Sequence, residues 1–169
     1  MAEPAGGRRT RVGAVLAVGV LLAAGLSGCS GTKSYCASLK TDQKKLSTLA
    51  TQAARPGAKG ADALGSTVRV LDGLRDQAPD DIRDQWDTVV AALQGVVDAA
   101  KATGHPLADF AGGRRPAGVT PGQLQAVRAA AAEMTGTRVQ QAGQSIEQHA
   151  QDVCKVDLGS GLGGGLAGG

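Results

Sequence analysis

The chain has 169 residues, of which 42% are hydrophobic, 2% aromatic and 20% charged, and its formal net charge is +3. One Trp, one Tyr and one Phe leave Leu, Val, Ile and many Ala to build a core, which suits closely packed helices and argues against a β-sandwich. Three of the 18 Lys and Arg residues and one of the 15 acidic residues precede residue 29, so the remaining chain carries +1. The length supports one domain, and the composition gives no support for nucleic-acid binding.

The N-terminus has the pattern of an export signal. Arg8, Arg9 and Arg11 precede an apolar run over residues 12–25. As a helix this run would span about 21 Å, which is short of the ~30 Å hydrocarbon core of a bilayer. A charged start, a short apolar stretch and small residues at its end predict a secretory signal rather than a membrane span.

The segment Leu26-Ser27-Gly28-Cys29 resembles the bacterial lipobox, in which the Cys thiol receives a diacylglyceryl group and the signal is cut before it. We therefore expect residues 1–28 to be a lipoprotein signal peptide, followed by lipidated Cys29 and a short tether over residues 29–33. The alternative is a structural Cys in an ordinary signal. No cofactor is expected besides the diacylglycerol and N-acyl chain on Cys29. Two or three acyl chains anchor a protein stably, which predicts a place on the outer face of the cell membrane.

Cys36 and Cys154 remain as an even pair in an oxidising compartment. Neither has a C-x-x-C partner, so a disulfide is favoured over two free thiols or half of a metal site. It would close almost the whole mature chain into a loop. For a loop of about 100 residues, the chain-entropy model predicts that a disulfide stabilises the folded state by roughly 4.7 kcal/mol.

Apolar residues recur at helical spacing in four segments. The first runs from about residue 33 to 54, before Pro56, and the second from about 60 to 77. The third begins at residues 79–81 and closes at residues 104–106. Its apolar stripe is the most regular in the chain and consists of Ile82, Trp86, Val89, Leu93, Val96 and Ala100.

The fourth predicted helix has the clearest start. Thr120, Pro121 and Gln123 provide a capping hydroxyl, a proline in the first turn and the amide of a capping box. The pattern continues to Cys154, which would make an unusually long helix. Gly136 lies between two threonines within it, so we expect a kink or break there.

Four amphipathic helices with mostly short connections predict an all-α fold, an antiparallel four-helix bundle with up-down-up-down order over residues 34–158. In this order the start of the first helix lies beside the end of the fourth, where Cys36 and Cys154 stand. One disulfide would then close the bundle. Residues 159–169 are rich in Gly and are expected to form a disordered tail.

The lipobox, the pair Tyr35-Cys36 and the segment at residues 152–158 together resemble small helical lipoproteins of actinobacterial genomes. The start of the fourth helix at residues 120–124 is similar to the T-P-x-x-L pattern of their last helix. The resemblance implies an extracytoplasmic helical lipoprotein and assigns no activity to it.

A metal site near the C-terminus is one reading of His149, with Glu147 and Asp152 beside it and Cys154 five residues on. However, this spacing separates His149 from Cys154 around a helix, and a disulfide would consume the thiol. A solvated helix face is therefore the preferred interpretation, and no metal site is expected.

Catalysis has no support in the sequence. Four acids could suggest a carboxylate cluster, namely Asp80, Asp81, Asp84 and Asp87. We interpret them, mixed with Arg83, as the charged first turns of the third helix. No nucleophile elbow or catalytic triad signature appears, so an enzyme is not expected.

The tether is short, so the disulfide end of the bundle should lie close to the membrane. The turn at residues 55–60 and the loop at residues 104–119 then fall at the far end. Basic side chains dominate there: Arg55, Lys59, Lys101, His105, Arg114 and Arg115, against Asp109. Leu107 and Phe110 are expected to be partly exposed in the same loop.

From these residues we predict a binding or scaffold module whose far end meets an envelope protein or an anionic polymer. Arg55, Lys59, His105, Phe110, Arg114 and Arg115 are the candidate partner-binding residues. The competing interpretation is a solvated loop in which Leu107 and Phe110 cap the core. A different class of function is a small-ligand carrier with an apolar pocket between helices, although Ala-rich faces predict tight packing without one.

Overall fold

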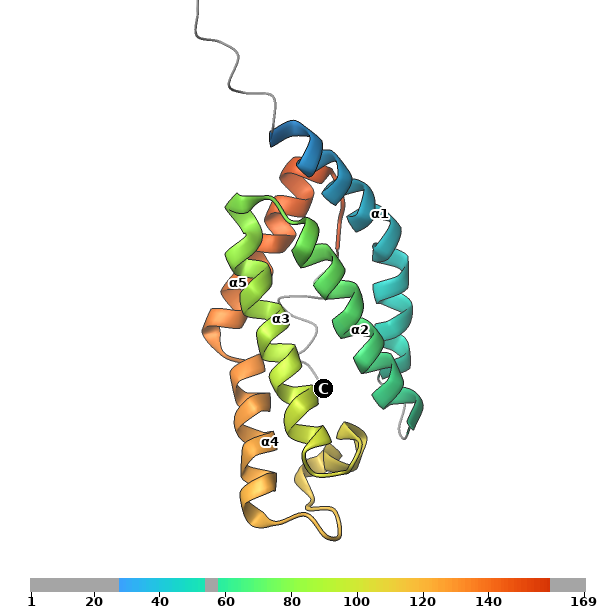
Figure 1. Ribbon diagram of the computed structural model, residues 1–169, viewed down its shortest axis with the longest axis vertical. Helices are drawn as coiled ribbons and strands as arrows, with labels where there is room; N and C mark the ends of the chain where they lie inside the picture. Colours follow the sequence, from blue (N-terminus) through green and yellow to red (C-terminus); the bar gives the residue numbers. More distant parts are fainter. Residues whose placement is uncertain (1–27, 54–57, 159–169) are drawn as a thin grey trace, which may run out of the picture.

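A computed structural model describes residues 28–53 and 58–158, and all regular structure in these ranges is helical (Figure 1). The elements are α1 (Gly28–Ala53), α2 (Ala58–Gln77), α3 (Asp80–Lys101), the 3₁₀ helix η1 (Leu107–Gly113), α4 (Pro121–Met134), α5 (Thr137–His149) and the π-helical turn η2 (Ala150–Cys154). In these ranges no helix combines the length and the apolar character needed to cross a membrane. Most of the predicted signal, the predicted tail and Arg55 lie outside the described residues.

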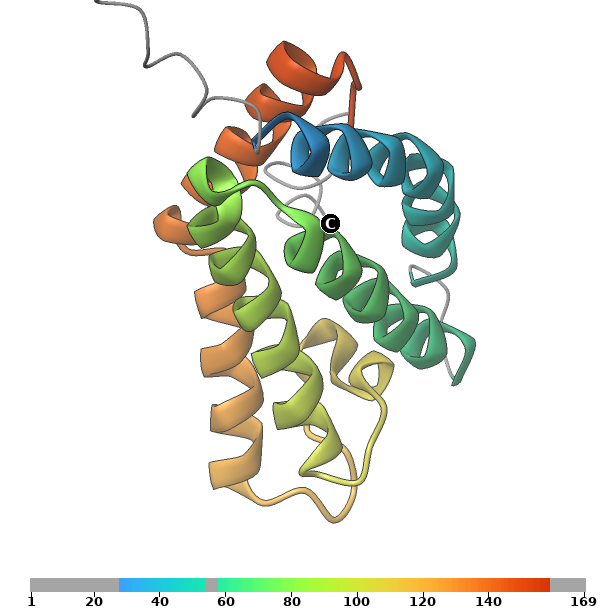
Figure 2. The same cartoon turned by 45° about the horizontal axis from the view of Figure 1, so that its top comes forward.

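Helices that follow one another in the chain pack against one another. α1 packs against α2, α2 against α3, and α3 against both α4 and α5, while η2 returns to α1 (Figures 1 and 2). Hydrogen bonds between side chains join the first three helices. Between α1 and α2, the Ser38 hydroxyl donates to Gln77 Oε1 at 2.7 Å, and between α3 and α2, Gln94 Nε2 donates to Asp72 Oδ2 at 3.2 Å. The described chain thus has five α-helices where four were predicted.

The extra helix arises because the last predicted helix is broken where expected, at Gly136. This residue has an extended backbone, with φ −68° and ψ 153°, between α4 and α5. A Cβ atom here would lie 3.0 Å from the Glu133 carbonyl oxygen, which accepts the Gly136 N–H. Glycine therefore permits a close approach of the two helix ends that a side chain would obstruct.

Two boundaries differ from the sequence-based expectation. α1 begins at Gly28 rather than near residue 33, so the expected tether at residues 29–33 consists of helical turns. No proline in this stretch opposes a helix. The expected loop at residues 104–119 contains η1, whose first turn is closed by the Asp109 N–H donating to the Pro106 carbonyl.

Two apolar clusters form the core. The main one lies among α1, α2, α3, α5, the end of α4 and the segment after η2, and a smaller one consists of Phe110, Val119 and Val127. All six residues of the predicted stripe on α3 are buried, so that stripe is confirmed. Trp86 from α3 and Tyr35 from α1 are completely buried and are the largest side chains of the main cluster.

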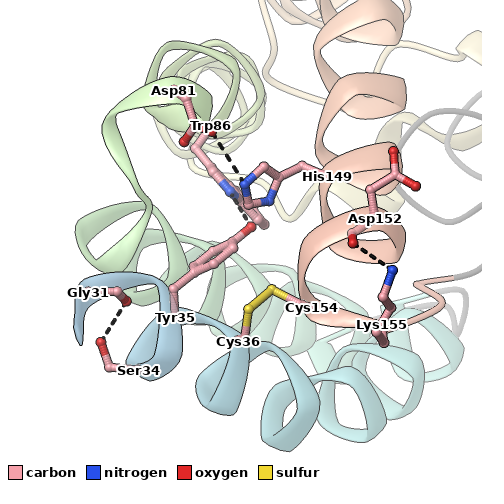
Figure 3. The surroundings of a disulfide bond; sticks show 10 residues. All are labelled: Gly31, Ser34, Tyr35, Cys36, Asp81, Trp86, His149, Asp152, Cys154 and Lys155. Atoms are coloured by element: carbon pink, nitrogen blue, oxygen red, sulfur yellow. Dashed lines mark hydrogen bonds and ion pairs between the residues drawn. A yellow bond between two sulfur atoms is a disulfide. The ribbon is translucent and has the colours of Figure 1, made fainter. Parts of the chain in front are cut away.

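The predicted disulfide between Cys36 and Cys154 is present and joins α1 to η2 (Figure 3). The two Cα atoms are 5.0 Å apart and the residues are separated by 118 positions in the chain. The bond therefore closes a loop that contains nearly every described element.

We expect the Cys36→Ala/Cys154→Ala double variant to lose about 4–5 kcal/mol of unfolding free energy, because an open chain gains entropy when it unfolds. Urea unfolding of both proteins measures the difference. Each single variant, fully reduced, should match the double variant. A loss below about 1 kcal/mol would contradict the expected contribution of this disulfide to the unfolding free energy.

Candidate functional site

The loop after η1 lies at the end of the long axis opposite the start of α1. In Figure 1, α1 begins at the top, whereas residues 114–120 and the start of α4 lie at the bottom. We call the guanidinium groups of Arg114, Arg115 and Arg128 at this end the distal surface. Arg114, Arg115 and Arg128 are all exposed to solvent.

Two arginines hold the loop in shape. Gly113 and Gly118 have positive φ values of 71° and 84°, which few other residues adopt without strain. Arg128 Nη2 donates to the Gly113 carbonyl at 2.8 Å, and Arg115 Nη1 donates to the Val119 carbonyl at 2.9 Å. Side chains therefore fasten both flanks of the loop.

The start of α4 is tied to the end of α3. Thr120 and Gln123 form the predicted capping box: Thr120 Oγ1 accepts from the Gln123 N–H, and Gln123 Oε1 accepts from the Thr120 N–H. Gln123 Nε2 also donates to the Ala102 carbonyl at 3.2 Å. This bond positions the loop relative to α3.

The expectation that Phe110 is partly exposed is wrong. Its side chain is only 9% exposed and packs with Val119 and Val127, because η1 turns the ring toward α4. Leu107 is half-buried and contacts both apolar clusters. These two side chains cap the core, so the distal end presents polar and basic groups instead.

Charge at the distal end is unbalanced. Between Asp109 and Glu133 the sequence contains no acidic residue. The Asp109 carboxylate contacts His105, whose Nδ1 lies 3.2 Å from Asp109 Oδ2. Lys101 is paired as well, since its Nζ lies 3.7 Å from Asp98 Oδ1. In the described chain, ion pairs of arginine with carboxylates involve Arg75, Arg83 and Arg138, and none involves Arg114, Arg115 or Arg128.

The other candidate residues fare differently. Lys59 lies in the first turn of α2, which packs against η1, and Arg55 lies outside the described residues. Arg128 was not among the predicted residues. The absence of acids across residues 110–132 is the sequence signal that could have found it.

At the opposite end, Tyr35 links three helices around the disulfide (Figure 3). Its hydroxyl accepts a hydrogen bond from Trp86 Nε1 at 3.0 Å, and the two rings meet edge to face at 6.4 Å. The His149 ring lies 5.8 Å from the Tyr35 ring. α1, α3 and α5 therefore meet at one buried phenol.

The predicted solvated position of His149 is also wrong. Its side chain is 11% exposed, and Nε2 lies 3.7 Å from Asp81 Oδ2. Nδ1 is buried, without a hydrogen-bond partner among the described residues. The disulfide occupies the Cys154 thiol, and in the described ranges no three His, Cys, Asp or Glu side chains gather as metal ligands would.

The acids of α3 spread along its surface. Asp80 pairs with Arg83 at 3.0 Å, Asp87 lies 3.7 Å from Arg75, and Asp81 faces His149. These contacts point in different directions, as expected for charged first turns of a helix. The contact between Asp81 and His149 joins residues far apart in sequence and left no local signal.

A surface depression of about 370 Å³ lies beside the junction of α4 and α5. Its lining consists of Asp87, Thr88, Ala91, Ala92, Glu133 and Arg138. Glu133 and Arg138 form an ion pair across the helix break. Charged groups and alanines do not make the apolar pocket that a carrier of small apolar ligands needs.

No protein-family model, curated protein or solved structure matches the chain.

The Phe110→Ala variant should lose about 3 kcal/mol of unfolding free energy, because it leaves a void between η1 and α4. Urea unfolding measures this loss. Phe110→Leu keeps most of the volume and should lose less than about 1.5 kcal/mol. If Phe110→Ala unfolds within about 0.5 kcal/mol of the parent, the ring is not a core residue.

Burial raises the pKa of the Tyr35 hydroxyl above its ordinary value of 10.0, the Trp86 hydrogen bond lowers it in part, and the nearby Asp81 charge raises it further. At a pH between the ordinary pKa of the unfolded chain and the raised pKa of the folded chain, Tyr35 has lost its proton only in the unfolded state. The unfolding free energy should therefore fall as pH rises above about 10. Tyrosinate absorbance reports this residue alone, since the chain has one Tyr. A phenol that titrates normally in the folded protein would contradict its burial.

Proposed function

We propose that the chain is a lipid-anchored, extracytoplasmic binding or scaffold module of the cell envelope. Cys29 carries the lipid, and the distal surface faces away from the bilayer. The observation that carries the proposal is the placement of residue 29 in the first turn of α1, at the opposite end of the long axis from residues 114–120 (Figure 1).

The anchor follows from the lipobox at residues 26–29 and the apolar run before it. α1 starts at Gly28 and runs without interruption to Ala53, so no spacer separates the lipid from the helix. The start of α1 and η2 lie together at one end of the molecule (Figure 2). That end accordingly rests near the bilayer surface.

We take α4 and α5 as two halves of one last helix, which makes the architecture an antiparallel bundle with up-down-up-down order. The two ends of such a bundle lie apart along its helices. This arrangement suits a module that holds a binding surface above a membrane.

A binding role is preferred to catalysis because the acids of α3 face separate partners rather than one another. It is preferred to ligand carriage because three charged side chains, Asp87, Glu133 and Arg138, line the surface depression at the junction of α4 and α5. The binding surface consists of groups that pair with anions.

Metabolic labelling with a palmitate analogue and cell fractionation test the anchor. The parent chain should take up label, lose residues 1–28 and appear in the membrane fraction. Cys29→Ala should take up no label and keep residues 1–28, because the thiol that starts processing is gone. Ser30→Ala, which keeps the thiol, is the matched control. An unlabelled parent chain would overturn the proposed anchor.

A further inference from the structure

We infer that the distal surface, formed by Arg114, Arg115 and Arg128, binds an anionic polymer with repeated phosphate or carboxylate groups. This inference rests on the proposed function, which turns the distal surface away from the bilayer. It narrows the two partners expected from the sequence to the anionic polymer, and it adds a residue, Arg128, that the sequence did not single out.

The three guanidinium groups keep most of their hydrogen-bonding capacity. Each guanidinium has five N–H donors. Arg115 and Arg128 each give one nitrogen to a backbone carbonyl, and Arg114 makes no hydrogen bond or ion pair in the described chain. Most of the donors therefore face solvent, where phosphate or carboxylate oxygens can accept two parallel bonds from one guanidinium.

Contacts within the protein hold the Arg115 and Arg128 charges in place. Arg128 reaches across from α4 to the carbonyl of Gly113, the residue directly before Arg114. Arg115 closes the other flank through Val119. Charges on a fastened loop lose less conformational freedom on binding than charges on a free loop, so more of their attraction appears as affinity.

The exposed groups of the distal end favour a polymer over a protein partner. Protein interfaces centre on buried aromatic or apolar anchors. At the distal end Phe110 and Val119 are buried, and the large apolar side chain exposed in the described chain is Val153, in η2 at the other end. Several cations without an apolar centre match a partner that carries evenly repeated negative charges.

Flotation of the full-length lipidated protein on neutral phosphatidylcholine vesicles tests the inference. Fluorescent polyphosphate supplies the phosphate chemistry and fluorescent polyglutamate the carboxylate chemistry. At least one polymer should float with protein-loaded vesicles. The polymer that does so shows whether the surface binds phosphate or carboxylate groups. With three contacts, the affinity should fall with salt with a logarithmic slope of about −2.

Variants locate the binding surface. Arg114→Gln/Arg115→Gln/Arg128→Gln should weaken polymer retention roughly tenfold or more. Lys40→Gln/Lys44→Gln/Lys45→Gln removes the same charge from exposed positions of α1, and should change retention by about twofold or less. Arg114→Gln alone should weaken binding measurably without altering thermal unfolding, since Arg114 has no partner within the described chain.

The outcomes are distinct. If the protein floats but neither polymer floats with it, the inference is overturned and the anchor stands. Equal losses in the two triple variants overturn it too, because net charge alone would then explain binding. Photo-crosslinking from position 114 to a protein, with no polymer retained, would replace the polymer with a protein partner. If the protein itself does not float, the proposed anchor fails, and with it the orientation assumed here.

Discussion

The bond between Cys36 and Cys154 is the constraint on which the arrangement of the helices depends. α1 packs against α2 and contacts η2, to which the disulfide joins it. Tyr35, the neighbour of Cys36, enters the core and accepts the Trp86 hydrogen bond. One short segment of α1 thus fixes the first helix covalently to the last turn and noncovalently to α3.

This closure gives the molecule two ends with different chemistry. At the disulfide end, buried rings and the contact between His149 and Asp81 hold three helices together. At the distal end, arginines fasten a glycine-containing loop and keep most of their donors free. Under the proposed anchoring, a lipid at the disulfide end would place these cations away from the bilayer.

Local patterns predicted the features that local chemistry determines. Periodicity located the stripe of α3, the capping box located the start of α4, and Gly136 marked the break. Contacts between distant segments left no such pattern. Phe110 is buried because Val127 of α4 lies against it, and His149 because Tyr35 of α1 and Asp81 of α3 lie beside it. Arg114 and Arg115 were predicted because their charge is visible in the sequence. Arg128 was not predicted, because the loop geometry that brings the Gly113 carbonyl to its side chain is not visible there.

Peptide mapping of the native chain, digested without reduction, tests whether the disulfide closes the fold. We expect one cross-linked peptide pair that contains Cys36 and Cys154, with no free thiol at either position. After reduction the pair should separate into its two peptides. Free thiols at both cysteines in the native protein would contradict the closed fold.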